Sequence, residues 1–285
     1  MSGKRLIITA DDFGAATSVN EAIELGHRSG ILNTASLMVS GRAVEDAVFR
    51  AKRMPDLRVG LHVTVTDAPP MLDPSLVPLL VDRNGELPKT LVRSAFSFAV
   101  SSKARAQLHD EIRAQFDAFA KTGLKLDHVN GHNHMHIHPL VLDIILKVGR
   151  SYGLRAVRLP YEPYVPSWRA THADAIARFG YGVLLLPVIA MMRRRLRRES
   201  IGFNDYLFGI ADTGKMTGER VLHYLRELPE GVSELHLHPA TARWPGMLSY
   251  ARCEDELDAL TNPSVRNALS ELGIVTTSFS ELCSA

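Results

Sequence analysis

Cysteines and long apolar runs are scarce in this sequence of 285 residues. The two cysteines, Cys253 and Cys283, lie too far apart to suggest a disulfide framework, so we expect a protein of the reducing cytoplasm. The longest apolar stretch, residues 181–192, contains a proline and is shorter than the roughly 20 residues that a membrane-spanning helix needs. The N-terminal apolar run is also short and leads into two aspartates, which argues against a signal peptide.

An excess of one charge is absent as well. The 33 lysines and arginines nearly balance the 31 acidic residues, and the net charge of +2 predicts no nucleic-acid partner. No G-x-G-x-x-G follows the first apolar run, which counts against a dinucleotide-binding fold. The sequence also contains no G-x-S-x-G, so it lacks the nucleophile turn of many serine hydrolases.

The arginines are unevenly distributed. Five of them directly follow the apolar stretch, at Arg193, Arg194, Arg195, Arg197 and Arg198. Two interpretations stay open: a buried helix followed by a solvated basic turn, or an element that lies on a membrane with its arginines on anionic lipid. We therefore keep peripheral contact with the inner membrane face, through residues 181–198, as one expectation.

Apolar runs alternate with amphipathic stretches along the whole chain. The apolar or β-branched runs predict strands at residues 6–8, 34–39, 59–65, 126–129, 156–159, 233–237 and 274–277. About seven strands alternating with helices imply a mostly parallel sheet, and we predict an α/β fold in the form of an irregular (β/α) barrel. We expect one domain over 1–285, with insertions near 67–100 and 161–215.

Polar side chains lie inside, at the end of or directly after several of the predicted strands. Such positions form the active sites of β/α barrels, because the carboxyl ends of parallel strands meet at one face. The residues concerned are Asp11, Asp12, His62, His132, His134, His136, His138, Arg158, His236 and His238. A purely solvated surface would scatter histidines more evenly, so the sequence predicts a functional site here.

Two of these motifs also allow simpler interpretations. Asp11 and Asp12 could form a turn and a helix cap, although adjacent carboxylates at a strand end repel each other unless a cation lies nearby. The alternating histidines of residues 132–138 could be a surface patch if that segment is extended. A catalytic metal usually takes about three protein ligands, so we expect one of these histidines as a ligand and others as supporting or substrate contacts.

The ordered motifs T-A-D-D-F-G at 9–14, G-L-H at 60–62, D-H-V-N-G-H-N-H-M-H at 127–136 and H-P at 238–239 resemble the YdjC-like carbohydrate deacetylases. That family is similar to the broader NodB-type polysaccharide deacetylases. The stretches around residues 119–130 and 153–160 look most like the subgroup of hopanoid biosynthesis, often called HpnK. The resemblance implies an irregular β/α barrel with one divalent ion, Zn²⁺ or Mg²⁺.

The resemblance also implies roles for individual residues. It makes Asp12, His62 and His132 the metal ligands. It makes Asp11 the general base and His238 the general acid of amide hydrolysis.

Further residues would support this chemistry. By the same resemblance, Arg158 orients the base, and His134, His136 and His236 are candidates for substrate contact or for support of the ligands. Gly131 stands where many family members have serine, which should alter a supporting hydrogen bond and leave the ligand itself in place.

The implied reaction removes the N-acetyl group from an N-acetylglucosamine-type sugar, within the subgroup on a hopanoid lipid. Two other function classes stay open. One is another barrel metallohydrolase, such as a phosphoesterase or amidohydrolase, although these place H-x-H after the first strand. The other is a non-catalytic barrel that binds sugar or lipid. The oligomeric state is open too, with a homodimer as one option.

Overall fold

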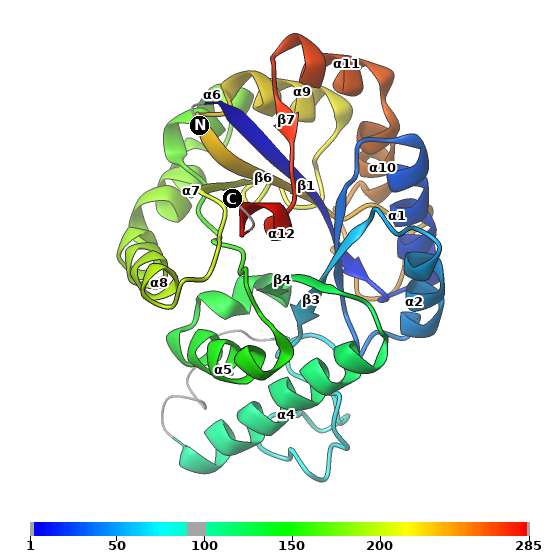
Figure 1. The fold of residues 1–285 in the computed structure, drawn as a ribbon, viewed down its shortest axis with the longest axis vertical. Coiled ribbons are helices and arrows are strands. Elements are labelled where there is room, and N and C mark those ends of the chain that lie inside the picture. Colours follow the sequence, from blue (N-terminus) through cyan, green and yellow to red (C-terminus); the bar gives the residue numbers. More distant parts are fainter. Residues whose placement is uncertain (1–2, 90–100, 284–285) are drawn as a thin grey trace.

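The computed structural model describes residues 3–89 and 101–283, and its centre is a parallel sheet (Figure 1). The strands are β1 Lys4–Phe13, β2 Thr34–Leu37, β3 Arg58–Val63, β4 Leu126–Gly131, β5 Tyr206–Phe208, β6 Gly231–Leu237 and β7 Val275–Thr276. Their order in the sheet is β4-β3-β2-β1-β6-β5, and β7 pairs with the first half of β1. All of these pairs are parallel.

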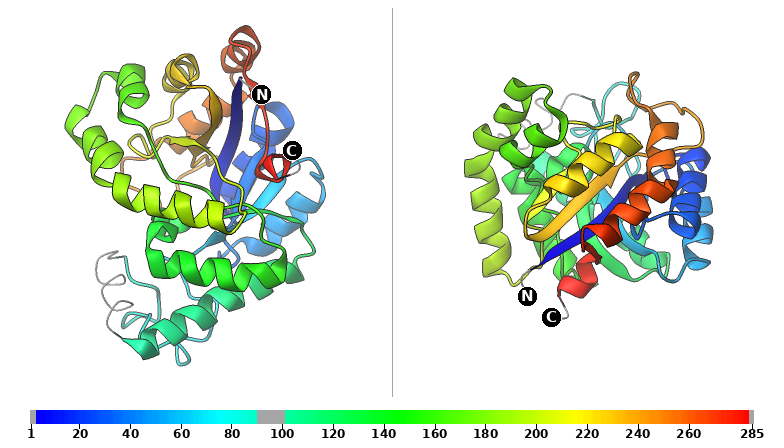
Figure 2. Two further views of the ribbon diagram at one scale, coloured as in Figure 1. Left: turned by 60° about the vertical axis from the view of Figure 1, so that its left-hand side comes forward. Right: turned by 90° about the horizontal axis from the view of Figure 1, so that it is seen from above.

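The helices lie mostly on the outer side of the sheet (Figure 2). They are α1 Thr17–Ser29, α2 Val44–Lys52, α4 Ser102–Lys121, α5 Pro139–Gly149, α6 Tyr164–Thr171, α7 Ala175–Phe179, α8 Leu186–Arg198, α9 Gly218–Glu227, α10 Cys253–Thr261, α11 Pro263–Glu271 and α12 Phe279–Leu282. Three shorter helical segments are η1 His132–Ile137, η2 Arg150–Tyr152 and η3 Gly180–Leu184.

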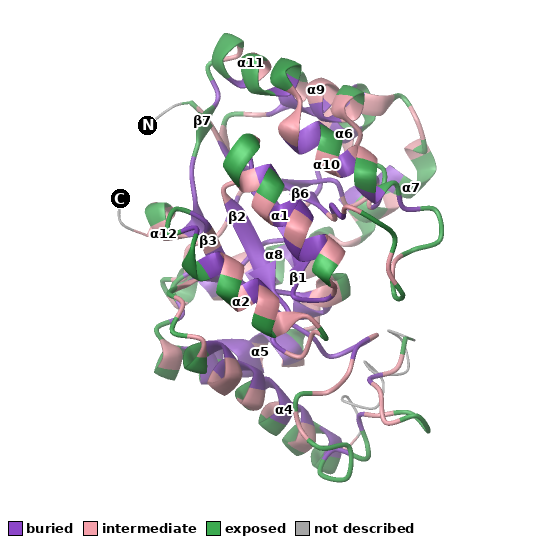
Figure 3. Ribbon diagram, turned by 90° about the vertical axis from the view of Figure 1, so that its right-hand side faces the viewer, coloured by how far each residue is buried: buried purple, intermediate pink, exposed green. Residues whose placement is uncertain are grey.

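Burial follows the apolar pattern of the sequence. Strands β1 to β6 are mostly buried and β7 is exposed, whereas the outer helices bury one face and expose the other (Figure 3). In α4, for example, Leu108, Ile112, Phe116 and Phe119 recur at helical spacing and lie in the core. This helix begins where the Ser101 side chain accepts a hydrogen bond from the Ala104 backbone N–H.

The sheet curls, and short bridges draw its two edges together. Residue 157 bridges to Val129 of β4, and Ala156 bridges to Gly202, shortly before β5. The predicted irregular barrel of about seven mostly parallel strands is therefore confirmed. The predicted strand at 156–159 is wrong in detail, because only these two isolated bridges form and the Leu159 N–H donates to the Asn204 side chain. The short strand β5 was not predicted.

The histidine run does not form the extended segment that its alternation suggested. Residues 132–137 form the 3₁₀ segment η1, in which Asn133 and His134 have left-handed backbone angles, with φ of 51° and 54°. The histidines therefore point in different directions and do not share one face. The one-face interpretation of this motif is wrong because the backbone turns directly after β4.

Both predicted insertions carry structure of their own. Residues 67–89 form a loop closed by an antiparallel bridge between Ala68 and Leu87, and the expected continuation over 90–100 lies outside the described residues. The segment 161–215 contains α6, α7, η3 and α8 as well as β5. In the described chain no single helix is both long and apolar enough to cross a membrane. The pair Ala175–Leu184 and Leu186–Arg198, bent by 43°, reaches that length and composition only jointly.

Candidate active site

The polar residues predicted for the site meet at the carboxyl edge of the sheet. Asp11 and Asp12 come from β1, His62 from β3, and His132 from the turn after β4. Asp12 has a left-handed φ of 63°, and the register of β1 against β2 shifts at this point. The irregularity lets two consecutive carboxylates, both buried, serve two neighbouring groups of side chains.

The first group consists of Asp12, His62 and His132. Asp12 Oδ1 lies 3.1 Å from His132 Nδ1 and 3.4 Å from His62 Nε2. The three ligand atoms all lie within 4.8 Å of one another. Burial alone would raise the pKa of Asp12, but the two imidazoles hold it well below its usual value. One carboxylate and two imidazoles suit a divalent cation such as Zn²⁺ and leave further coordination positions free.

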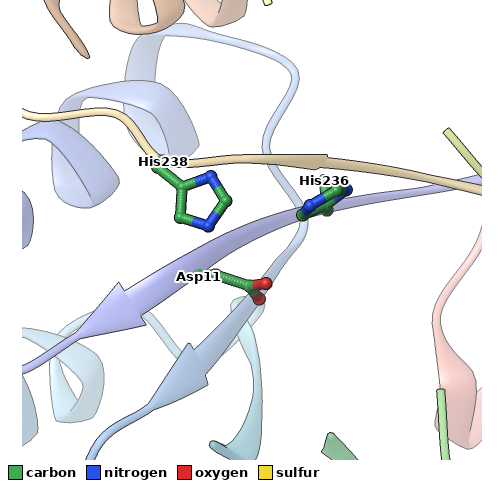
Figure 4. A group of neighbouring side chains, drawn as sticks. All are labelled: Asp11, His236 and His238. Atoms are coloured by element: carbon green, nitrogen blue, oxygen red, sulfur yellow. The ribbon is translucent and has the colours of Figure 1, made fainter. Parts of the chain in front are cut away.

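The second group consists of Asp11, His236 and His238 (Figure 4). These side chains also lie close enough to hold a cation, with ligand atoms within 4.8 Å. However, both Asp11 oxygens already accept from Arg158, at 2.6 and 2.9 Å. A carboxylate that a guanidinium already neutralises is a poorer metal ligand than Asp12. The geometry therefore favours the first group for the cation.

Burial sets the charge states in the second group. It would raise the pKa of Asp11, yet Arg158 and the neighbouring His62 keep this pKa well below its usual value. Burial, reinforced by Arg158, lowers the pKa of His236 to about 3. His236 is therefore neutral at physiological pH, and its Nδ1 lies 3.1 Å from the Phe208 carbonyl oxygen, to which it can donate. A neutral ring and an ionised carboxylate face the same space.

Glu234 completes the environment of Arg158. The fully buried guanidinium donates to Glu234 at 2.7 and 3.0 Å, in addition to its two bonds with Asp11. Thr9 donates a further bond to Glu234, at 2.7 Å. Glu234 was not predicted as a site residue, although an acidic residue within the apolar strand β6 is a usable signal. The buried Arg158 guanidinium, held between the carboxylates of Asp11 and Glu234, fixes the orientation of Asp11.

The remaining histidines divide into two kinds. His134 lines the cavity described below, and burial lowers its pKa well below the usual value. His136 is fully buried, and its Nε2 lies 3.1 Å from the Arg158 carbonyl oxygen. His134 can therefore contact a substrate, whereas His136 is placed to support the backbone of Arg158.

Asn130 joins the two groups and was also overlooked. It is fully buried, and two orientations of its side-chain amide fit the same position. In one, the oxygen faces His62 Nδ1 at 2.6 Å, while the nitrogen donates to Ser36 and Asp11 at 2.8 and 3.3 Å. In the other, the nitrogen donates to His62 and the oxygen accepts from Arg158 and Ser36. A cation on His62 Nε2 selects the first, because Nδ1 then carries the ring proton and needs an acceptor.

We therefore expect Asn130→Ala to lower the affinity for a divalent cation by about 10–100-fold, the usual cost of losing a partner behind a metal ligand. Calorimetric titration of the metal-free protein with Zn²⁺ or Mg²⁺ measures the effect. Ser36→Ala is the control, because it removes a partner of Asn130 and leaves the bond to His62. Equal affinities in Asn130→Ala and wild type would show that His62 needs no such support.

Two cavities meet at His132. One, of about 640 Å³, is lined by residues of both groups and by an apolar wall from the 161–215 segment and its surroundings. The apolar wall includes Ile137, Pro160, Tyr181, Leu185, Val188 and Ile210. The other, of about 530 Å³, lies between the start of α1 and the 67–89 loop and contains Trp244 beside charged residues. A ligand at the first group could therefore extend in two directions.

Comparisons with known proteins place these observations in a family. The sequence matches the YdjC-like protein family over residues 5–271. It is 28% identical to a carbohydrate deacetylase of Vibrio parahaemolyticus, over 98% of this chain and 97% of that protein. It is 26% identical to a chitooligosaccharide deacetylase of Serratia marcescens, over 98% and 99% of the two chains.

A solved structure supports the same assignment. A protein of Enterococcus faecalis, described as a candidate for cellobiose-phosphate cleavage, has a TM-score of 0.76 and 25% identity to this chain. The match covers 99% of both chains. Sequence and fold agree over nearly the whole length, and this chain belongs to the YdjC-like protein family.

Proposed function

We propose that this protein is a metal-dependent hydrolase that removes the N-acetyl group from an N-acetylglucosamine-type sugar. The observation that carries the proposal is that residues of two groups line one cavity: His62 and His132, which together with Asp12 suit a cation, and Asp11 with His238, suited to proton transfer. The relatives named carbohydrate deacetylase and chitooligosaccharide deacetylase, which align over nearly their full lengths, support the same reaction.

A divalent ion held by the first group would polarise the acetamide carbonyl and acidify the attacking water. Asp11 accepts the proton of that water, because Arg158 keeps its carboxylate ionised at neutral pH. Arg158 is itself anchored by Glu234 and so positions the base. The chain thus supplies a base whose charge and orientation are both set by buried partners.

His238 is the proposed acid. It lies in the same cavity as Asp11, and their nearest polar atoms are within 4.8 Å, so one acetamide can touch both. The His238 backbone N–H donates to the buried Glu256, which holds the residue at the end of β6. Protonated His238 delivers a proton to the departing amine, which a carbon–nitrogen bond needs in order to break.

We further propose that the acetylated sugar is carried by an apolar group, such as the hopanoid of the subgroup that the sequence resembles. The apolar wall formed by Tyr181, Leu185 and Val188 supports this proposal, since it borders the polar groups within one cavity. Zn²⁺ and Mg²⁺ are both candidates for the ion, and a cytoplasmic enzyme at the inner membrane face would meet such a substrate.

Acetate release tests the function. We expect acetate from N-acetylated chitooligosaccharides, or from an N-acetylglucosaminyl lipid, to appear with wild-type protein, to stop after treatment with a chelator and to return with added Zn²⁺ or Mg²⁺. Hydrolysis of a phosphate ester without acetate release would indicate another barrel metallohydrolase. Sugar binding without hydrolysis under any metal condition would indicate a non-catalytic barrel.

A further inference from the structure

The segment that forms the apolar wall also exposes apolar side chains on its outside. These residues, here called the apolar ridge, are Ile176, Phe179, Tyr181, Leu184, Leu186 and Met191. Ile176 is 90% exposed and Leu184 is 74% exposed. They all belong to the consecutive elements α7, η3 and α8, which lie along one side of the molecule (Figure 1). Apolar surface concentrated in this way marks an interaction site more often than scattered single residues do.

The exposed face of α8 changes character along its axis. Leu186 and Met191 are exposed near its start, and Arg194, Arg197 and Arg198 are exposed near its end. Ile189, Met192 and Leu196 on the opposite face are buried, so the helix lies on the protein with its outer stripe free. The stripe therefore runs from apolar to basic, as in helices that lie in the plane of a membrane surface.

Not all five arginines of this helix are available to a partner. Arg193 donates to the Asp205 carbonyl oxygen at 3.1 Å. Arg195 pairs with Asp143 at 3.1 Å and with Glu199 at 2.8 Å. In the described chain we find no ion pair for the three exposed arginines, of which Arg197 lies over the ring of Phe203. Three arginines therefore face outward, and no acidic side chain of the described residues pairs with them.

A cavity lies where the apolar and basic parts meet. It measures about 300 Å³, lies between α5 and α8, and is lined by Arg194, Arg195 and Arg198 together with Ile137 and Met191. Asp143 also lines it and pairs with Arg195, which leaves Arg194 and Arg198 as its unpaired cations among the described residues. Guanidinium groups beside apolar side chains suit an anionic headgroup with its attached chain. Ile137 also lines the active-site cavity, so the two spaces are neighbours.

We propose that the apolar ridge and the exposed arginines Arg194, Arg197 and Arg198 form a docking surface for a membrane that contains anionic lipid. The proposal rests on the proposed function in one respect: docking brings the active-site cavity, whose wall includes Tyr181 of the ridge, to the lipid headgroups. Charge favours lipid over a second copy of this chain, since contact between two such surfaces would bury arginines without acidic partners.

Vesicle co-sedimentation of the whole protein tests the docking surface. The wild type should pellet with phosphatidylglycerol–phosphatidylcholine vesicles at low salt and much less at high salt. Each basic residue near an anionic surface is worth about fivefold in binding, so R194Q/R197Q/R198Q should bind roughly 100-fold more weakly. Ile176→Ser with Leu184→Ser should also weaken binding, because both side chains would lie among the lipids.

A control variant removes exposed apolar side chains elsewhere on the molecule. Phe49→Ser with Leu25→Ser changes exposed side chains on α2 and α1, and this variant should bind vesicles as the wild type does. The proposal is overturned if the wild type stays in the supernatant, or if both ridge variants pellet as the wild type does. It is also overturned if the ridge substitutions convert a dimer into a monomer in light scattering while vesicle binding is unchanged.

A soluble substrate separates this proposal from the proposed function. The active-site cavity is not lined by Ile176, by Leu184 or by any of the three exposed arginines. We therefore expect the ridge variants to release acetate from a soluble chitooligosaccharide at the wild-type rate and to lose activity on a vesicle-embedded acetylated glycolipid. If the wild type releases acetate from neither substrate, the deacetylase proposal is refuted. If the ridge variants and the wild type act on the embedded lipid at equal rates, the docking surface is refuted.

Discussion

Asp11→Asn is expected to lower kcat for acetate release by about 10²–10⁴-fold, the usual cost of losing a general base. The amide of asparagine has nearly the shape of the carboxylate but cannot take up the proton of water. The fold should persist, because Arg158 keeps Glu234 as a counter-charge at 2.7 Å. Bound metal should also persist, because Asp12, His62 and His132 are unchanged. Steady-state kinetics at saturating metal, together with metal analysis, measures both results.

Asp212→Asn is the matched control for this substitution. Asp212 also pairs through two hydrogen bonds with a buried arginine, Arg178, at 2.8 Å, but it lies outside both candidate groups. The Asp212→Asn substitution should lower thermal stability and leave kcat within about tenfold of the wild-type value, a much smaller decrease than loss of a general base causes. Near-normal turnover in Asp11→Asn would transfer the role of base to another group, with His134 as the next candidate in the cavity.

His132→Ala is expected to lower metal affinity and activity together. His132 is one of only three protein ligands proposed for the ion, and its Nδ1 lies 3.1 Å from Asp12 Oδ1. Loss of a supporting partner lowers metal affinity by about 10–100-fold, and removing a direct ligand should lower it further. Metal analysis after dialysis, and acetate release across a range of added metal, should show the two losses in parallel.

His134→Ala is the control for that experiment. It removes a neighbouring imidazole in the same cavity but outside both candidate metal groups, so bound metal should stay at the wild-type level. Full metal occupancy in His132→Ala would contradict the assignment. Loss of metal in His236→Ala and His238→Ala instead would place the ion in the second group, beside Asp11.

The main chemical components could be predicted from sequence because their signals are local. The apolar run of β1 ends in Asp11 and Asp12, and the run of β6 ends in His236 and His238. Parallel strands carry such end residues to one edge of the sheet, so the barrel and the set of candidate side chains follow from the pattern. The short strand β5 lacked a signal of this kind, because three residues are too few to show a period.

The partnerships within the site depended on the tertiary structure. The left-handed backbone of Asp12 divides the two aspartates between different groups, and the turn after β4 sends His132 and His136 in different directions. Neither feature has a periodic pattern that a sequence could reveal. Asn130 and Glu234 acquire their roles only through contacts with residues far away in the chain.

The segment around residues 181–198 shows the same division. By itself, the sequence determined that an apolar stretch precedes five arginines, since composition is local. It could not decide between a buried helix and a surface element, because burial depends on what the rest of the fold places against each face. The structure buries Ile189 and Met192, exposes Leu184 and Met191, and leaves three of the five arginines facing outward. Only packing against distant parts of the chain decides which side chains of an amphipathic helix meet solvent, and this decision belongs to the tertiary structure.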